Sequence, residues 1–464
     1  MSYDDVAWEK SDEVEVAWKS AMLEEENLRA VGNFIAKHRS GTPEFLHRPK
    51  TGAFNVVAQM DFADGSAIIR FPIPGSCMFP EEKTRYEVAA IRFIQDKTAI
   101  PVPFILHWGT AKESPGSSGP FILMDYNEHL EDACDALNTP GLTRDDRPIL
   151  DPNICNIKLE KIYSQMANIL LQLSTISLPK IGSLTEVEKG VWDVTHRPIT
   201  FNMNNLVQLG TLPRSKLPLS TFDSSASYFC ALANMNIEHL SHQRNDAIES
   251  ADDCRRKYVA RHLFRQLAQN SQLTQPNHDA GPFKLWCDDL RPSNTLRNSE
   301  CDVVAVIDWE FTYSAPVEFT YTPPWWLLLG RPETWDGGLD SWIKEYEPRL
   351  EVFLKVMRER EDVSIASGLL KEDQRLSGHM QRSWETGDFW VMYAARNSFA
   401  FDAIFWRLLD RRFFGPGGGW DGWKSRINLL MEEERAGMEA FVNRKMEEAK
   451  ERTLHGWEPI EEAL

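Results

Sequence analysis

Hydrophobic and polar residues alternate early in the chain, and this alternation predicts a β-hairpin. The apolar positions of its first strand are Phe54, Val56, Ala58 and Met60. The segment Ala63–Gly65 then interrupts the pattern with residues that favour a turn, and an apolar strand resumes at Ala67.

A helix and two further strands are expected to follow this hairpin. Pro72, Pro74 and Gly75 break the chain, and residues 81–95 then carry apolar side chains at helical spacing. Short apolar runs follow at 104–108 and 121–124. The resulting order, strand–strand–helix–strand–strand, predicts a small, mostly antiparallel sheet carrying one helix.

Helical periodicity dominates the chain on either side of this unit. Upstream, Leu28, Val31 and Ile35 predict a helix within residues 1–44. Downstream, we expect a long helix around 159–173, ended by Pro179, and then loops with short elements over 180–250. Further helices are predicted at 251–270, 339–358, 385–410 and 420–452. The β-branched run Val303–Ile307 is the exception and predicts a strand.

Composition and charge restrict the classes of protein. The 464 residues are 42% hydrophobic and 26% charged, as in ordinary globular proteins. The 51 basic and 69 acidic residues give a net charge of −18, so phosphate-rich nucleic acid is a poor partner. The most apolar run, Pro323–Leu329, is too short to span a membrane. The N-terminus lacks the pattern of a secretory signal, and seven scattered cysteines form no C-x-x-C pair. We therefore expect a cytoplasmic protein.

The candidate chemistry lies in the segment around the predicted strand Val303–Ile307. Asp289 and Asn294 are five residues apart in a Pro-containing loop, and Asp308 follows at the end of the strand. Phosphoryl transfer needs a carboxylate that accepts a hydroxyl proton and two oxygen-bearing side chains that hold Mg²⁺. The three residues supply this set. Taken alone, Asp289 and Asn294 could simply cap a turn beside Pro292; the strand and Asp308 favour catalysis.

These motifs resemble those of the aminoglycoside phosphotransferase family, and in particular its fungal-type members. The family's H-G-D-x-x-x-x-N loop and I-D-W/F-E motif correspond here to Cys287–Asn294 and Ile307–Glu310. Gly52–Asn55 lies at the nucleotide-loop position and Phe121–Tyr126 at the crossing between lobes, and Phe389–Phe414 resembles the family's aromatic C-terminal helices. The resemblance implies an α+β, bilobal, protein-kinase-like fold with a small antiparallel β-rich lobe and a larger helical lobe.

The resemblance also implies roles for individual residues. Asp289 would be the catalytic base, Asn294 and Asp308 would hold Mg²⁺, and ATP would be the phosphoryl donor to a hydroxyl of a small molecule. The residues expected to bind the nucleotide are Gly52, Phe54, Asn55, Arg70, Glu87, Met124 and Tyr126. The expected divisions are a helical extension (1–44), a nucleotide-binding lobe (45–125) and a helical lobe with the substrate site (126–464).

Three residues depart from the family's pattern. Arg70 stands where the family commonly has lysine, and Cys287 and Asp288 replace histidine and glycine. Arginine keeps the charge but reaches phosphate with a planar fork. The lost histidine needs another group to bond the loop backbone, and Asp288 would raise the pKa of Asp289 if the two side chains approached each other, although adjacent side chains usually diverge. These departures motivate an alternative function: a pseudokinase that binds a nucleotide or a partner. A protein Ser/Thr kinase is a weaker third hypothesis, because no activation-segment end follows Asp308.

Other motifs have simpler interpretations. Arg70 and Glu87 could form an ordinary surface ion pair. Glu238, His239 and His242 resemble a metal pair without a third ligand, so structural histidines are favoured. The run Gly415–Gly419 lacks the Lys-Ser/Thr of a P-loop and predicts a connection between helices. Cys287 has no evident base partner as a nucleophile. Trp325 and Trp326 are expected in the core, and the acidic net charge would suit a cationic acceptor such as an amino sugar or choline, although net charge describes the whole surface.

Overall fold

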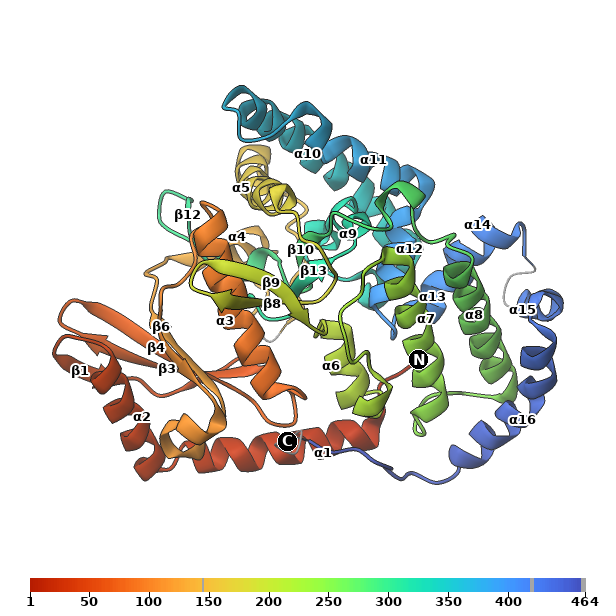
Figure 1. Ribbon diagram of the computed structural model, residues 1–464, viewed down its shortest axis with the longest axis horizontal. Coiled ribbons are helices and arrows are strands. Elements are labelled where there is room, and N and C mark those ends of the chain that lie inside the picture. The colour runs from red at the N-terminus through yellow and green to blue at the C-terminus, as the bar shows by residue number, and fades with distance from the viewer. Residues whose placement is uncertain (144–145, 418–420, 460–464) are drawn as a thin grey trace.

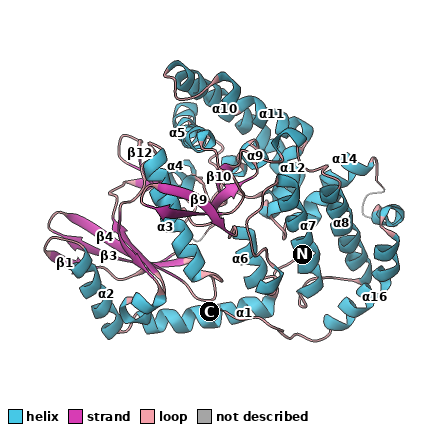
Figure 2. Ribbon diagram, viewed as in Figure 1, coloured by secondary structure: helices cyan, strands magenta, loops and turns pink. Residues whose placement is uncertain are grey.

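The computed structural model describes residues 1–143, 146–417 and 421–459 and has two unequal parts (Figure 1). A small antiparallel sheet comes first, and a larger, mainly helical part follows, as the secondary-structure colouring shows (Figure 2). This confirms the predicted fold class. The proposed division at residues 44 and 125 stays a prediction.

The sheet forms from the predicted alternating segments. Its strand order is β1-β3-β4-β6-β5, with β2 paired to β3. The strands are β1 (Pro43–Leu46), β2 (Lys50–Thr51), β3 (Asn55–Phe62), β4 (Gly65–Pro72), β5 (Ile105–Gly109) and β6 (Phe121–Asp125). Val56, Ala58, Met60 and Phe62 of β3 are buried, as expected from a period of two. A tight turn joins β3 to β4, where Gly65 has a φ of +129° that suits glycine.

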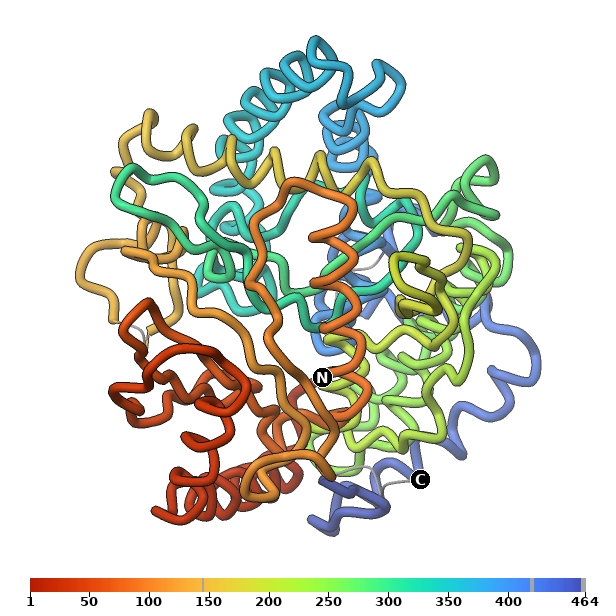
Figure 3. Tube along the Cα trace, turned by 60° about the vertical axis from the view of Figure 1, so that its left-hand side comes forward, coloured from red at the N-terminus to blue at the C-terminus, as the bar shows by residue number. Residues whose placement is uncertain are grey.

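Helix α3 (Pro80–Lys97) follows β4 and lies between the sheet and the helical part (Figure 3). Pro80 occupies its first turn, where a missing N–H costs nothing, and Glu81 and Glu82 complement the positive end of the helix dipole. The predicted order strand–strand–helix–strand–strand is thereby confirmed. The helix carries Lys83 and Glu87 on one buried face, one turn apart.

The first 44 residues form two helices where one was expected. Helix α1 (Asp5–Met22) ends at Leu23, and α2 (Glu25–His38) packs Val31 and Ile35 against the sheet. Helix α1 also bridges the two parts. Its Ser11 hydroxyl donates to the Gly75 carbonyl at 2.6 Å and accepts from Gln208 of α6 at 2.9 Å. In Figure 1 this helix runs from below the sheet toward α6 (Phe201–Gln208).

The helical part contains most of the predicted helices and several that periodicity missed. Helices α5 (Asn156–Thr175), α8 (Ala251–Gln269) and α10 (Gly338–Ala366) confirm three predictions. Over 180–250, where loops with short elements were predicted, the short elements are β8 (Ser183–Glu188), β9 (Val191–His196) and α6, whereas the 18-residue helix α7 (Ser225–His242) was not predicted. Helix α7 has small and polar residues among its apolar ones, which hides its period.

The C-terminal region is more broken than predicted. The single helix expected over 385–410 is interrupted at Gly387, which adopts φ +79°, and again after Arg396. The elements are α11 (Ser377–Thr386), α12 (Asp388–Arg396), α13 (Phe401–Ile404), a π turn (Phe405–Leu409) and α14 (Asp410–Phe414). The last predicted helix begins at residue 420, outside the described residues, and contains α15 (Trp423–Arg426) and α16 (Glu432–Glu448).

Two small sheets and two short helices surround the loop that carries Asp289 and Asn294. Strand β10 (Lys284–Cys287) pairs with β13 (Thr312–Ala315), and β11 (Thr295–Arg297) pairs with β12 (Val303–Val306) and β7 (Glu131–Asp132). The helices α4 (Ala133–Leu137) and α9 (Val317–Thr320) adjoin them. None of the helices among the described residues is both long and apolar enough to cross a membrane.

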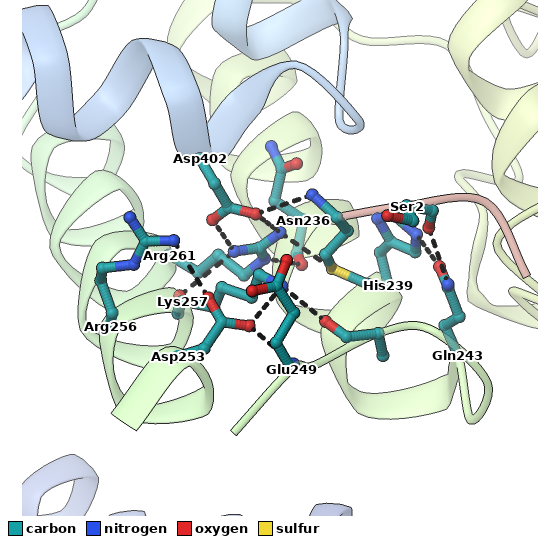
Figure 4. Close-up of polar contacts among 12 residues, drawn as sticks. Ser2, Asn236, His239, Gln243, Glu249, Asp253, Arg256, Lys257, Arg261 and Asp402 are labelled. Carbon is teal, nitrogen blue, oxygen red and sulfur yellow. Dashed lines mark hydrogen bonds and ion pairs between the residues drawn. The ribbon is translucent and has the colours of Figure 1, made fainter. Parts of the chain in front are cut away.

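Buried ion pairs join the helices of the larger part (Figure 4). Asp402 of α13 accepts hydrogen bonds from both terminal nitrogens of Arg261 on α8, one of them at 3.1 Å. On the same helix Lys257 donates to Asp253 at 2.6 Å. All four side chains are buried, so each charge depends on its partner for compensation.

Replacing Asp402 tests this compensation. The variant Asp402→Ala leaves Arg261 buried without its carboxylate, and we expect a loss of about 3–5 kcal/mol in the free energy of unfolding. Urea unfolding followed by circular dichroism measures the loss. Asp340→Ala, which removes an exposed pair with Arg407, is the matched control and is expected to cost less than about 1 kcal/mol. Equal losses in the two variants would contradict the assignment.

Candidate active site

The loop after β10 brings the candidate base and the candidate metal ligand together. Asn294 lies in a 3-10 turn, Pro292–Asn294, and its amide donates to the Asp289 carboxylate at 3.1 Å and to the Asp289 carbonyl at 2.8 Å. These two bonds close the loop and orient the carboxylate. Among the described residues, the one contact that the side-chain oxygen of Asn294 accepts is a long one, 3.4 Å, from Ser293, so it has capacity for a further partner.

Asp308 reaches the same place from the other side. The N–H of Ile307 donates to the Asn294 carbonyl at 2.9 Å, which ties the end of β12 to the loop. Asp308 itself has a φ of +55°, a left-handed conformation that few non-glycine residues adopt and that costs about 1–3 kcal/mol. The surrounding contacts hold this conformation and direct the carboxylate toward the sheet.

Arg70 lies between two carboxylates. From β4 it forms ion pairs with Glu87 of α3 and with Asp308, and the guanidinium is almost completely buried. Burial raises the pKa of both carboxyl groups, and Arg70 opposes that rise. The alternative of an ordinary surface pair is wrong for Arg70 and Glu87, since both are buried.

A second buried cation, Lys83, was not among the predicted site residues. It forms an ion pair with Glu310 and donates to the side-chain oxygen of Asn55 at 3.0 Å. Asn55 in turn donates to Glu310 at 3.0 Å. Burial opposes ionisation of Glu310, but Lys83 and Arg70 hold its pKa below the usual range. Lys83 is four residues before Glu87 on the same helix face, so helical spacing could have pointed to it.

The predicted nucleotide loop packs onto this cluster. Gly52 donates its N–H to the Asn55 carbonyl at 2.8 Å, which forms the turn. The ring of Phe54 lies edge-on to Phe311 and Phe201, with centroids 5.6 and 5.7 Å apart. The loop therefore contacts residues of the helical part directly.

The two residues predicted at the crossing between lobes have packing partners of their own. The side chain of Met124 is 4% exposed and packs in the main hydrophobic core. The ring of Tyr126 is half-buried and packs against His129, with centroids 5.6 Å apart. The Tyr126 N–H donates to the Ser66 carbonyl at 3.0 Å, so the segment after β6 stays attached to the sheet.

The residues that replace the family's histidine and glycine have defined partners. The Cys287 thiol donates to the Glu310 carbonyl at 3.5 Å, which supplies a bond between the loop and the segment after Asp308. Burial raises the pKa of Cys287 well above its usual range, and a protonated, buried thiol is a poor nucleophile. Asp288 is turned away from Asp289 and accepts from the Trp286 indole at 2.8 Å and the Phe201 N–H at 3.2 Å.

The environment of Asp289 changes its acidity. Burial raises its pKa to about 6, and Arg291, whose Nε lies 3.1 Å from the carboxylate, limits the rise. A carboxyl group with this pKa is mostly ionised at neutral pH yet more basic than a free aspartate. Such a pKa suits a group that accepts a proton near neutral pH.

The donor set fits Mg²⁺ better than a transition metal. Asn294 and Asp308 offer amide and carboxylate oxygens, the ligands Mg²⁺ prefers. Across residues 1–143, 146–417 and 421–459, no group of three or more His, Cys, Asp or Glu side chains is placed to hold a metal ion. Mg²⁺ usually takes one or two protein carboxylates and fills its other positions with phosphate and water, so a small set of oxygens is compatible with it.

Two other motifs lie among the described residues, and a third lies partly outside them. His239 is buried and bonds Gln243 at 2.7 Å, and burial lowers its pKa far below the usual value. Trp326 is in the core, whereas Trp325 is half-buried and lines an apolar pocket behind the loop. Part of the run Gly415–Gly419 lies outside the described residues, and its described start follows α14.

Comparisons with known proteins place the chain only loosely. No protein-family model matches it, and no curated protein matches it. Solved structures similar to it include aminoglycoside phosphotransferase APH(4)-Ia, at 13% identity over 81% of this chain and 98% of the other, with a TM-score of 0.41. Macrolide 2'-phosphotransferase type I is 12% identical over 90% and 98%, with a TM-score of 0.41. Spectinomycin phosphotransferase APH(9)-Ia, in complex with ADP and spectinomycin, is 11% identical over 89% and 98%, with a TM-score of 0.39. Because these values are low, function must be inferred from the side chains of this chain.

The buried pair of Lys83 and Glu310 can be tested without any substrate. Lys83→Met leaves Glu310 buried and unpaired, and we expect the free energy of unfolding to fall by about 3–5 kcal/mol. The double variant Lys83→Met/Glu310→Gln removes both charges and should recover part of that loss. Urea unfolding of the single and double variants measures both values. A double variant less stable than Lys83→Met would contradict charge compensation.

Proposed function

We propose that the protein is an ATP- and Mg²⁺-dependent phosphotransferase that moves the γ-phosphoryl group to a hydroxyl of a small molecule. One observation carries this proposal. Asn294 bonds Asp289, the N–H of Ile307 bonds the Asn294 carbonyl, and the next residue, Asp308, forms an ion pair with Arg70, so groups from separate strand ends and from the sheet form one connected set. A base, two oxygen ligands and a phosphate-binding cation are the groups that phosphoryl transfer requires.

Asp289 would act as the base in this reaction. Its carboxylate accepts the proton of the acceptor hydroxyl while the oxygen forms a bond to the γ-phosphorus, and the bond from that phosphorus to the bridging oxygen of ADP breaks. Asn294 holds the carboxylate by a 3.1 Å hydrogen bond, so the base is oriented before the substrate arrives.

The groups around the base would hold the donor. Arg70, which lies on strand β4, would contact the phosphate oxygens. Its ion pair with Glu87 would hold the guanidinium in position. The predicted nucleotide residues Gly52, Phe54 and Asn55 lie just before or at the start of β3, the strand that pairs with the Arg70 strand β4. Asn294 and Asp308 would hold Mg²⁺, which supplies neutralisation of the triphosphate charge when bound. The proposed roles of Met124 and Tyr126 rest on their place at the end of β6, an interior strand of the sheet, with Met124 inside the strand and Tyr126 directly after it.

A second candidate function has one observation in its favour. Asp308 already forms an ion pair with Arg70, so a metal ion would have to share this carboxylate with a guanidinium. A pseudokinase that binds a nucleotide or a partner without transferring phosphate would keep this pair. Transfer of labelled phosphate from ATP to a hydroxylated compound separates the two functions, because only the enzyme performs it.

Loss of the base should lower the rate of turnover strongly without unfolding the chain. We expect Asp289→Asn to lower kcat by about 10²–10⁴-fold, the usual contribution of a general base. ADP release in the presence of acceptors measures the rate, and thermal unfolding checks that the fold persists. Asp373→Asn, an exposed aspartate, is the control and should keep full activity. An Asp289→Asn protein as fast as the parent would exclude this residue as the base.

The raised pKa of Asp289 predicts a pH dependence. Because the base works only when ionised and its pKa is about 6, kcat/KM should be near its plateau at pH 7–8 and fall about tenfold per pH unit below pH 6. A pH profile from 5 to 8, recorded with the protein checked for folding at each point, measures this limb. A profile that stays flat down to pH 5 would contradict the assigned role.

A further inference from the structure

Arg331 lies in the helical part and packs on Phe201, whose backbone is bonded to the loop of the candidate base. It connects two short 3-10 helices, Trp325–Leu328 and Pro332–Thr334. Its guanidinium carbon is 4.5 Å from the centroid of the Trp325 ring and 5.2 Å from that of Phe201. Contact with two aromatic faces fixes a planar cation without using its N–H groups.

Phe201 connects this cation to the catalytic loop. Its N–H donates to the Asp288 carboxylate at 3.2 Å, next to Asp289, and its ring packs against Phe311 at 5.7 Å. The charge of Asp289 is also felt at Arg331. Burial lowers the pKa of the guanidinium, and the nearby side chains of Tyr393, Glu333 and Asp289 more than offset that effect, so its pKa is raised.

The N–H groups of Arg331 are poorly used within the protein. Arginine has five donors. Within the part of the chain that the structure describes, this side chain donates to the Tyr393 hydroxyl and makes one long hydrogen bond, 3.5 Å, to Asn397, which leaves further donors for a ligand. A Glu333 oxygen is 3.9 Å away, too far for a hydrogen bond, and the other oxygen of Glu333 accepts from Tyr393 at 2.6 Å. The Arg331 side chain is 24% exposed, so part of it faces solvent.

Two further arginines lie close to the carboxylates of the loop. Arg291 follows the base, with its Nε 3.1 Å from the Asp289 carboxylate and its side chain 38% exposed. Arg396 lies over the rings of Trp286 and Phe319, at 4.5 and 4.7 Å, and is 3.9 Å from Asp288. The surroundings of the base are therefore rich in guanidinium groups, although the chain as a whole carries a charge of −18.

We infer that the phosphoryl acceptor carries a carboxylate or phosphate group, which Arg331 binds while the acceptor hydroxyl lies at Asp289. This inference rests on the proposed function. A fixed guanidinium with free donors matches the two oxygens of such a group, and an amine at the same place would meet repulsion. Arg331 lies on the helical part, whereas the proposed donor site at Arg70 and Gly52 lies on the sheet. The arginines near the loop thus favour an acidic acceptor, whereas the net charge of the chain had suggested a cationic one.

The first experiment measures transfer. ADP release and product mass are recorded with four compounds of similar size: gluconate, glucose 6-phosphate, glucose and glucosamine. We expect turnover or competitive inhibition from the two acidic compounds and neither from the other two. Arg331→Met should raise the KM or inhibition constant of the acidic compounds by about 10–150-fold, as expected for charged hydrogen bonds, and leave the KM of ATP unchanged. Arg331→Lys, which keeps the charge but loses the fork, should lie between.

The second experiment measures binding without ATP. Gluconate and glucose 6-phosphate should raise the melting temperature of the parent protein, and Arg331→Met should remove that shift while keeping its own melting temperature. Arg411→Met, an exposed arginine on α14, is the matched control and should keep the shift. Comparing the two acids shows which acid group is preferred.

The outcomes separate the two proposals. Binding of the acids through Arg331 with no phosphoryl transfer would refute the proposed function and leave the acid-binding site standing. Transfer to glucose or glucosamine that persists in Arg331→Met would refute the acidic acceptor and leave the phosphotransferase standing. Absence of any shift or inhibition by both acids would also refute the inference.

Discussion

The ion pairs of Arg70 with Glu87 and Asp308 are the interaction on which the site depends. A guanidinium from the sheet, buried between a helix and a strand end, is tolerated only because two carboxylates compensate it. Lys83 and Glu310 repeat this compensation nearby. Two cations thus face three carboxylates, which leaves one negative charge in excess where a divalent cation would bind. The ion pairs that join the sheet to the helical part therefore also set the charge of the proposed ATP site.

The hydrogen bonds of the loop complement these ion pairs. Asn294 holds Asp289 from within the loop, and Ile307 brings the strand before Asp308 against Asn294. Cys287 adds a hydrogen bond to the Glu310 carbonyl, and Asp288 points away from Asp289 and accepts hydrogen bonds from Trp286 and Phe201. The departures from the family's loop therefore do not leave the loop unsupported. Asp288 also positions Phe201, the aromatic face on which Arg331 lies.

Local patterns in the sequence predicted the sheet and the groups around the loop. Alternation over Phe54–Met60 and the helical stripe before Gln95 depend on neighbours along the chain, so they were visible without coordinates. Helix α7 was missed because its apolar periodicity is weak. The breaks at Gly387 and Arg396 were missed because the apolar periodicity continues across them, and tertiary packing determines where the helices end. Lys83 was missed although its spacing to Glu87 was available. Arg331 offered no signal, since its contact with Phe201 joins residues 130 positions apart.

A crystal structure with a non-hydrolysable ATP analogue and Mg²⁺ tests the central claim most directly. The account predicts the metal at about 2.0–2.1 Å from the side-chain oxygen of Asn294 and a carboxylate oxygen of Asp308. It also predicts the γ-phosphate next to Asp289 and in contact with Arg70. A metal bound elsewhere, or an analogue whose phosphates lie away from Asp289, would contradict it.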